Sequence, residues 1–200
     1  MTDFVAADGL ARCKWSGAAP EFLDYHDHEW GFPVSDDIRL FEKLCLESFQ
    51  SGLSWRTILT KREGFRAAFD DFDFHKIARY DARDIDRLLN DASIVRHAGK
   101  IAAVINNAAC AVKMVETEGK LASFFWGFEP NAEDLGPPQS QSTSETSIAL
   151  ARELKRRGWK FLGPTTVFAF MQAMGLINDH SEGCAIRAAA NEARRKFQRP

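Results

Sequence analysis

The chain has 200 residues, of which 45% are hydrophobic and 27% charged, with 16 Phe and a formal net charge of −2. This composition is typical of a folded globule with an aromatic-rich core and excludes global disorder, while the length allows one large domain or two small lobes. Since the sequence shows no leading basic and apolar stretch and no run of about 20 apolar residues, we expect a cytoplasmic protein without a membrane segment.

Helical spacing of apolar residues recurs along most of the chain, and no segment alternates as a strand does, so we predict an all-α fold. The first helix is predicted to start at Ser35, ahead of two aspartates, and to stop at Gly52. A second helix is predicted to start at Ser54 and to carry Phe69. Both helices place apolar side chains on one face, as core-facing helices do.

A pair of helices with a short turn between them is predicted next. Asp81 and Asp84 form a capping pattern ahead of the first helix of the pair, which ends near Asp91. The second helix is predicted from about His97 to Val115. Two helices joined this closely form a hairpin.

The later part of the chain is predicted to hold a loop and two more helices. Residues 129–144 are rich in Pro, Ser and Gln and are expected to form a loop that crosses between two lobes. Helices are predicted at about 145–157 and 165–174, each followed by Gly. The predicted organisation is a single domain, 1–200, with one lobe at 36–125, a second lobe formed by 1–35 and 145–190, and a basic tail at 188–200.

Basic side chains gather in stretches that lack acidic ones, although the net charge is slightly negative. No Asp or Glu occurs between Ala92 and Val115 or between Leu154 and Asn178, and both stretches carry several basic residues. Clusters of this kind suit contact with nucleic-acid phosphates. A solvated helix face is the alternative for each cluster, because Lys and Arg are usually exposed.

Four stretches of the chain resemble one known family of proteins. They read CKWSGAAPEFLDYHDHEWG (13–31), LESFQSGLSW (46–55), IVRHAGKI (94–101) and GWKFLGPTTVFAFMQAMGLINDHSEGC (158–184). At these places, and over most of the chain from Arg12 to Cys184, the sequence resembles the 3-methyladenine DNA glycosylase I family. The resemblance implies a helix-hairpin-helix DNA glycosylase fold, hydrolysis of the N-glycosidic bond of N3-methyladenine in alkylated double-stranded DNA without lyase activity, and one bound zinc ion.

The residues also offer the chemistry that such a pocket needs. Adenine methylated at N3 carries a positive charge, so its pocket should combine electron-rich aromatic faces with a carboxylate. The resemblance implies that Glu47 accepts a hydrogen bond from the exocyclic amine of the flipped base and that Trp55 stacks on that base. Because the alkylated base is already a good leaving group, Glu47, the one predicted catalytic residue, is expected to act in recognition first and in catalysis second. The predicted substrate-binding residues are Trp15, Tyr25, Trp30, Glu47, Gln50 and Trp55.

A plainer interpretation applies to each of these residues taken alone. An isolated Glu on a helix is usually solvated, and a single Trp belongs to the core more often than to a pocket. Trp126 and Trp159 lie outside the pocket motifs, so we predict that both are core residues. Cys45 and Cys110 lie on apolar helical faces and are expected to be buried, inert thiols.

A structural zinc site is predicted from two pairs of residues near opposite ends of the chain. His180 and Cys184 are four positions apart, so a helical turn points both side chains the same way. With Cys13 and His26 they offer two thiolates and two imidazoles, and four protein ligands leave no open position for a catalytic water. The resemblance implies this set of ligands, with His26 rather than the neighbouring His28.

The segment 81–115 is the predicted DNA-anchoring hairpin, whose turn presents backbone N–H groups to a phosphate. The family often has Gly where this chain has Ser93, and a non-Gly residue tolerates positive φ poorly, so the turn geometry stays open at this point. No Lys stands at the hairpin end where lyase-type relatives carry a nucleophile, which agrees with hydrolysis only. The predicted DNA-binding residues are Ser93, Arg96, His97 and Lys100.

Two kinds of alternative function stay open on the sequence. One is a related enzyme, either a mismatch adenine glycosylase or an alkylpurine glycosylase of broader substrate range, although the acidic residue expected after the hairpin in such enzymes is absent. The other is a zinc-stapled helical module that binds DNA or protein without catalysis. For the glycosylase a monomer is expected, because an enzyme acting alone on one flipped base needs no second subunit.

Overall fold

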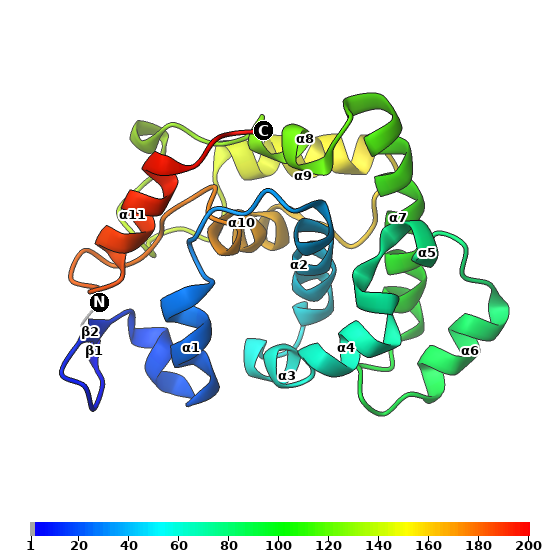
Figure 1. The fold of residues 1–200 in the computed structure, drawn as a ribbon, viewed down its shortest axis with the longest axis horizontal. Coiled ribbons are helices and arrows are strands. Elements are labelled where there is room, and N and C mark those ends of the chain that lie inside the picture. Colours follow the sequence, from blue (N-terminus) through cyan, green and yellow to red (C-terminus); the bar gives the residue numbers. More distant parts are fainter. Residues whose placement is uncertain (1–2) are drawn as a thin grey trace.

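The computed structural model describes residues 3–200 and is mostly helical, which confirms the predicted fold class (Figure 1). The elements are β1 (Phe4–Val5), β2 (Ala11–Arg12), α1 (Glu21–His28), α2 (Asp37–Gln50), α3 (Trp55–Thr60), α4 (Arg62–Ala68), α5 (Phe74–Ile77), α6 (Ala82–Asn90), α7 (Ala98–Glu118), α8 (Leu121–Trp126), α9 (Glu145–Arg156), α10 (Pro164–Ala173) and α11 (Arg187–Lys196), with short 3-10 turns η1 (Lys14–Ala18), η2 (Asp70–Phe72) and η3 (Ala132–Asp134). The antiparallel pair β1 and β2 was not predicted, because two-residue strands are too short to show alternation.

Side-chain caps set the helix starts largely as the sequence indicates. Asp36, rather than the predicted Ser35, caps α2, since its carboxylate accepts the Arg39 N–H at 2.8 Å. Ser54 caps α3 as predicted, but the helix breaks at Lys61 and α4 follows, so the predicted second helix is in fact two. The predicted capping pattern ahead of α6 is a reciprocal capping box.

Helix α2 lies at the centre of the molecule and packs against both α7 and α10 (Figure 1). Ten consecutive residues of α2, from Leu40 to Phe49, are buried, and its apolar side chains belong to one continuous core. The two predicted lobes therefore meet through α2, and the segments on either side of the 129–144 loop share that core.

Helices α6 and α7 form the predicted hairpin, joined by residues 91–97 at the lower edge of the view in Figure 1. Ser93 has no positive φ; its N–H donates to the Asp91 carboxylate at 2.8 Å, so the turn accepts Ser without strain. Gly64 of α4 packs against Ser93. A Cβ added at Gly64 would lie 2.7 Å from the Ser93 carbonyl oxygen, so this close contact requires glycine. Helix α7 is long and apolar enough to cross a membrane, but its contacts with α2, α5, α6 and α8 account for that composition as a core helix.

The C-terminal segment 188–200, predicted as a basic tail, is largely helical and folds back on the molecule. Helix α11 covers most of it, and one acidic residue holds two of its arginines: Glu129 lies 2.8 Å from Arg194, within α11, and 2.8 Å from Arg199, which follows the helix. The Phe197 ring lies 4.5 Å from that of Trp126. These charges are therefore engaged within the fold.

Candidate active site and metal centre

A cavity of about 480 Å³ opens between α1, the C-terminal end of α2, the start of α3 and the loop before α9. The six residues predicted to bind substrate all line it: Trp15, Tyr25, Trp30, Glu47, Gln50 and Trp55. A volume of this size suits a single planar base with its sugar. The structure thus brings together residues that lie as many as 40 positions apart in the sequence, from Trp15 to Trp55.

Indole and phenol rings form one side of the cavity. The Trp15 and Trp30 rings meet edge to face at 5.1 Å, and the Tyr25 and Trp55 rings lie 5.2 Å apart. Phe22 adds a further ring that the sequence did not single out. Aromatic faces arranged around an open space attract flat, electron-poor or cationic rings.

Glu47 lies at the end of this aromatic wall and is paired with a residue that the sequence analysis missed. The Lys43 ammonium is 2.9 Å from Glu47 Oε1 and donates to the Tyr25 hydroxyl at 2.6 Å. Burial lowers the pKa of Lys43, and the nearby Glu47 carboxylate opposes that shift. Burial likewise raises the pKa of Tyr25 well above its ordinary value, with Glu47 adding to the effect. The sequence could have indicated this pair, because Lys43 and Glu47 are four positions apart and so lie on the same face of a helix.

Polar side chains from the loop before α9, from α10 and from the segment after it also line the cavity and were not predicted. Asp179 is buried, and its carboxylate accepts from the backbone N–H of Gln139 at 2.8 Å and from the Gln172 amide at 2.6 Å. Burial raises the pKa of Asp179, while these two hydrogen bonds oppose the shift. Gln139 has a φ of 57°, and the bond to Asp179 helps to hold this left-handed conformation.

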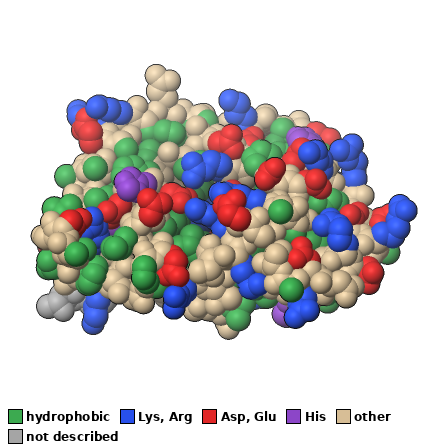
Figure 2. Space-filling model, turned by 60° about the horizontal axis from the view of Figure 1, so that its bottom comes forward, with side chains coloured by type: hydrophobic (Ala, Val, Ile, Leu, Met, Phe, Trp, Pro, Cys, Tyr) green, Lys and Arg blue, Asp and Glu red, His purple; other side chains and the backbone are tan. Residues whose placement is uncertain are grey.

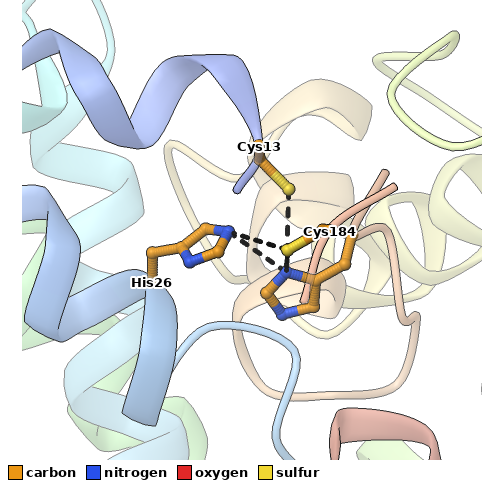
Figure 3. A group of neighbouring side chains, drawn as sticks. Cys13, His26 and Cys184 are labelled. Atoms are coloured by element: carbon orange, nitrogen blue, oxygen red, sulfur yellow. Dashed lines mark hydrogen bonds between the residues drawn. The ribbon is translucent and has the colours of Figure 1, made fainter. Parts of the chain in front are cut away.

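Four side chains converge beside the aromatic wall, and Figure 3 shows Cys13, His26 and Cys184 directed toward one another. With His180 they place one candidate ligand atom each within 4.8 Å of all the others, and all four residues are buried. The two facing imidazole nitrogens are 3.2 Å apart, and Cys184 Sγ lies 3.6 Å from His26 Nε2 and 3.5 Å from His180 Nδ1.

These spacings match those that a metal ion imposes. An ion bound tetrahedrally at about 2.0–2.1 Å from nitrogen and about 2.3 Å from sulfur sets nitrogens about 3.3 Å apart and nitrogen and sulfur about 3.6 Å apart. The outer ring nitrogens are engaged elsewhere: His26 Nδ1 with the Asp27 carboxylate at 2.7 Å and His180 Nε2 with the Trp30 carbonyl at 3.0 Å. Because both acceptors require a proton on the outer nitrogens, the inner ones present lone pairs. The cluster can therefore hold a metal ion.

The cluster also supports the cavity directly. The Trp15 ring lies 5.3 Å from that of His26, and the Trp30 ring lies 4.7 Å from that of His180. Arg12 in turn holds Asp27 at 2.7 Å, so the outer contacts of His26 extend to β2. Two of the aromatic walls are thus packed against the candidate ligands.

Three of the four residues predicted to bind DNA lie where a duplex could reach them. Ser93 and Arg96 are exposed in the hairpin turn, and the His97 ring caps α7 by accepting the Lys100 N–H at 3.2 Å. The prediction that Lys100 binds DNA is wrong. Its side chain is buried, and its ammonium donates to the Phe49 carbonyl at 2.8 Å, so Lys100 holds the end of α2 and does not face solvent. Figure 2 shows basic and acidic side chains intermixed on the lower face of the molecule, without a uniformly basic surface.

Comparison with known proteins supports one family. The methyladenine glycosylase model matches residues 15–188. The DNA-3-methyladenine glycosylase 1 of Escherichia coli is 44% identical over 179 residues, which cover 88% of this chain and 96% of that protein. The DNA-3-methyladenine glycosylase of Haemophilus influenzae is 43% identical over 182 residues, covering 89% of this chain and 98% of that protein.

Solved structures agree with the sequence relatives. A crystal structure of 3-methyladenine DNA glycosylase I matches with a TM-score of 0.80 at 43% identity and covers 87% of this chain and 98% of its own. The Staphylococcus aureus enzyme, solved for its recognition of 3-methyladenine, matches with a TM-score of 0.80 at 40% identity, covering 84% and 92% of the two chains. A variant of 3-methyladenine DNA glycosylase I in complex with 3-methyladenine has a TM-score of 0.79 at 39% identity, covering 84% and 93%. The chain belongs to the methyladenine glycosylase family.

Proposed function

We propose that this protein is a DNA-3-methyladenine glycosylase that removes N3-methyladenine from DNA by hydrolysing its N-glycosidic bond. The observation that carries the proposal is a cavity walled by aromatic rings and ended by the buried Glu47 carboxylate. The family relatives named above share both the sequence and the fold. The cavity has the shape and the chemistry that a flipped, cationic purine requires.

In this proposal each wall has its own role. The base leaves the duplex and stacks on Trp55, and its exocyclic amine donates a hydrogen bond to the Glu47 carboxylate. Because the Lys43 ammonium already balances the charge of Glu47, the carboxylate acts as an oriented acceptor more than as a free negative charge. N3-methylation has made the base a good leaving group, so holding it while water attacks the sugar is sufficient, and strong acid catalysis is not needed.

The hairpin would anchor the DNA, with Ser93, Arg96 and His97 nearest the backbone. The first N–H groups of a helix lack partners within that helix and attract phosphate, and α7 starts at the exposed turn. Such contacts read the shape of the backbone without reading sequence. This suits an enzyme that must find a damaged base in any context.

We also propose that the Cys13, His26, His180 and Cys184 cluster holds one zinc ion per chain in a structural role. Two thiolates and two imidazoles in a closed tetrahedral set are the donors of structural zinc sites. No fifth position is left for water, so the ion would supply stability and not catalysis. Its place behind Trp15 and Trp30 would make it a support for the cavity wall.

The test of the proposed function is the product released from methylated DNA. We expect the purified protein to release N3-methyladenine and no N7-methylguanine, identified by chromatography of the freed bases. Release of both bases would support the broader alkylpurine glycosylase instead. Binding of methylated DNA without release of any base would favour the non-catalytic module.

Replacement of Trp55 by Ala is expected to weaken base binding by about 1–3 kcal/mol, the usual worth of one aromatic stack. The measurement is the Kd of free 3-methyladenine, followed by tryptophan fluorescence. Trp159→Phe is a suitable control, because Trp159 is buried in the core and does not line the cavity. An unchanged Kd in Trp55→Ala would remove Trp55 from the binding wall.

A further inference from the structure

Lys43 makes an unusual set of contacts for a buried lysine. Its ammonium lies 2.9 Å from Glu47 Oε1, 2.6 Å from the Tyr25 hydroxyl and 3.6 Å from the centre of the Trp55 ring. The side chains of Lys43 and Glu47 are each only 6% exposed. One charged group therefore contacts three of the residues that line the cavity, although Lys43 itself does not line it.

Stability alone does not account for this lysine. Moving an ammonium and a carboxylate out of water is costly, and an apolar pair of the same size often stabilises a core equally well. The same helix already has a second, partly exposed ion pair, Glu42 with Arg66 at 2.8 Å, that does not line the cavity. What distinguishes Lys43 is the identity of its partners.

We propose that Lys43 is a positioning residue for base recognition, which holds the Glu47 carboxylate, the Tyr25 hydroxyl and the Trp55 ring in one arrangement before the base enters. This inference rests on the proposed function. By occupying Oε1, the ammonium leaves Oε2 of Glu47 to accept the amine of the base. By donating to the Tyr25 oxygen, it leaves the Tyr25 O–H free to donate in turn.

Lys43 also supplies the counter-charge of the Glu47 carboxylate. The other charged groups around the pair are already engaged: Glu29, just after α1, pairs with Arg62 of α4 at 2.7 Å, and Asp179 across the cavity is bonded to two amides. Without Lys43, the buried Glu47 would have no counter-charge of its own, and burial would favour the protonated acid. A protonated Glu47 loses acceptor capacity toward the amine of the base.

The test compares Lys43→Met, which keeps the length and removes the charge, with Lys43→Arg, which keeps the charge. The rate of N3-methyladenine release from DNA is measured under single-turnover conditions across a range of pH. The methylated base in DNA is a permanent cation, so its own charge does not vary with pH. Relative to the unmodified chain, we expect Lys43→Met to lose at least about tenfold more activity near about pH 6 than near about pH 9. Lys43→Arg should restore the original profile.

Glu42→Gln is the matched control, because it breaks an ion pair of a buried glutamate on the same helix without touching the cavity. It should lower the melting temperature and leave the pH profile unchanged. If Lys43→Met proves unfolded by circular dichroism, Lys43→Gln takes its place. A Lys43→Met profile parallel to that of the unmodified chain overturns the inference while leaving the proposed function intact; an unmodified chain that releases no base overturns both.

Discussion

Replacement of Glu47 by Gln is expected to lower the rate of N3-methyladenine release by about 100-fold or more, the usual cost of losing one preorganised electrostatic contact. The amide has the same shape as the carboxylate, but it accepts more weakly and can turn its own N–H₂ toward the amine of the base. It also leaves the Lys43 ammonium without its counter-charge. Single-turnover rates on DNA that contains N3-methyladenine measure the effect.

The fold should survive this change, because the hydrogen bond from Lys43 to Tyr25 remains. Near-normal circular dichroism and cooperative melting would show that the lost activity is not unfolding. Glu42→Gln again provides the comparison and should change the rate by no more than about twofold, as for a substitution that leaves the transition state untouched. A Glu47→Gln protein that retains full activity would be incompatible with Glu47 as the recognition residue.

Replacement of Cys184 by Ser is expected to abolish stoichiometric metal binding and to lower the melting temperature by about 10 °C or more. Serine does not supply a thiolate, and three remaining donors hold an ion much less tightly. The site links Cys13, just after β2, with α1 and with the segment before α11. Its loss should therefore destabilise the contacts between the N-terminal and C-terminal parts of the chain. Metal content by elemental analysis and thermal melting are measured on the same preparation.

Cys110→Ser serves as the control for loss of a thiol, because Cys110 is half-buried on α7 and takes no part in the cluster. This variant should keep one metal ion per chain and most of its stability. Freshly purified protein that contains no zinc would rule out the proposed ion. A Cys184→Ser protein that loses its metal but melts unchanged would show that the binding is incidental.

The local parts of the fold could be predicted from the sequence because their signals lie within a few residues. Ser54 and the pair Asp81 and Asp84 cap their helices as expected, since a cap depends only on the next turn of chain. The choice between Ser35 and Asp36 was wrong by one residue because both side chains can accept the same N–H groups. At Lys61 itself there is no Gly or Pro, and the nearby Gly64 lies inside α4, so the sequence did not indicate the break between α3 and α4.

The site was predictable only where rare residue types stand together. The aromatic residues and Glu47 are brought around one cavity, and the two Cys and His pairs form one cluster. The two buried lysines were not predicted, because Lys is usually exposed. This general rule led to the wrong assignment of Lys100 to the DNA-binding surface, and it gave no reason to place Lys43 beside the cavity. Each is buried against groups distant in sequence, such as the Phe49 carbonyl and the Tyr25 hydroxyl.

Two polar residues of the cavity could not be predicted because they lie outside the helices. Gln139 lies in the loop before α9, and Asp179 follows α10, so neither has a periodic pattern around it. Their contact depends on the left-handed backbone at Gln139, which nothing in the residue type favours. Only the folded chain brings them to the same cavity as Glu47.

Contacts between residues 11–13 and residues 181–185 close most of the chain into one large loop. Ser181 N–H donates to Cys13 Sγ at 3.3 Å, and Ala185 N–H donates to the Ala11 carbonyl at 2.8 Å, so a segment near the start of the chain is bonded to one near its end. Fraying usually begins at loose ends and spreads inward. An occupied cluster would hold these two segments together, and we expect their amide hydrogens to exchange as slowly as those of the interior.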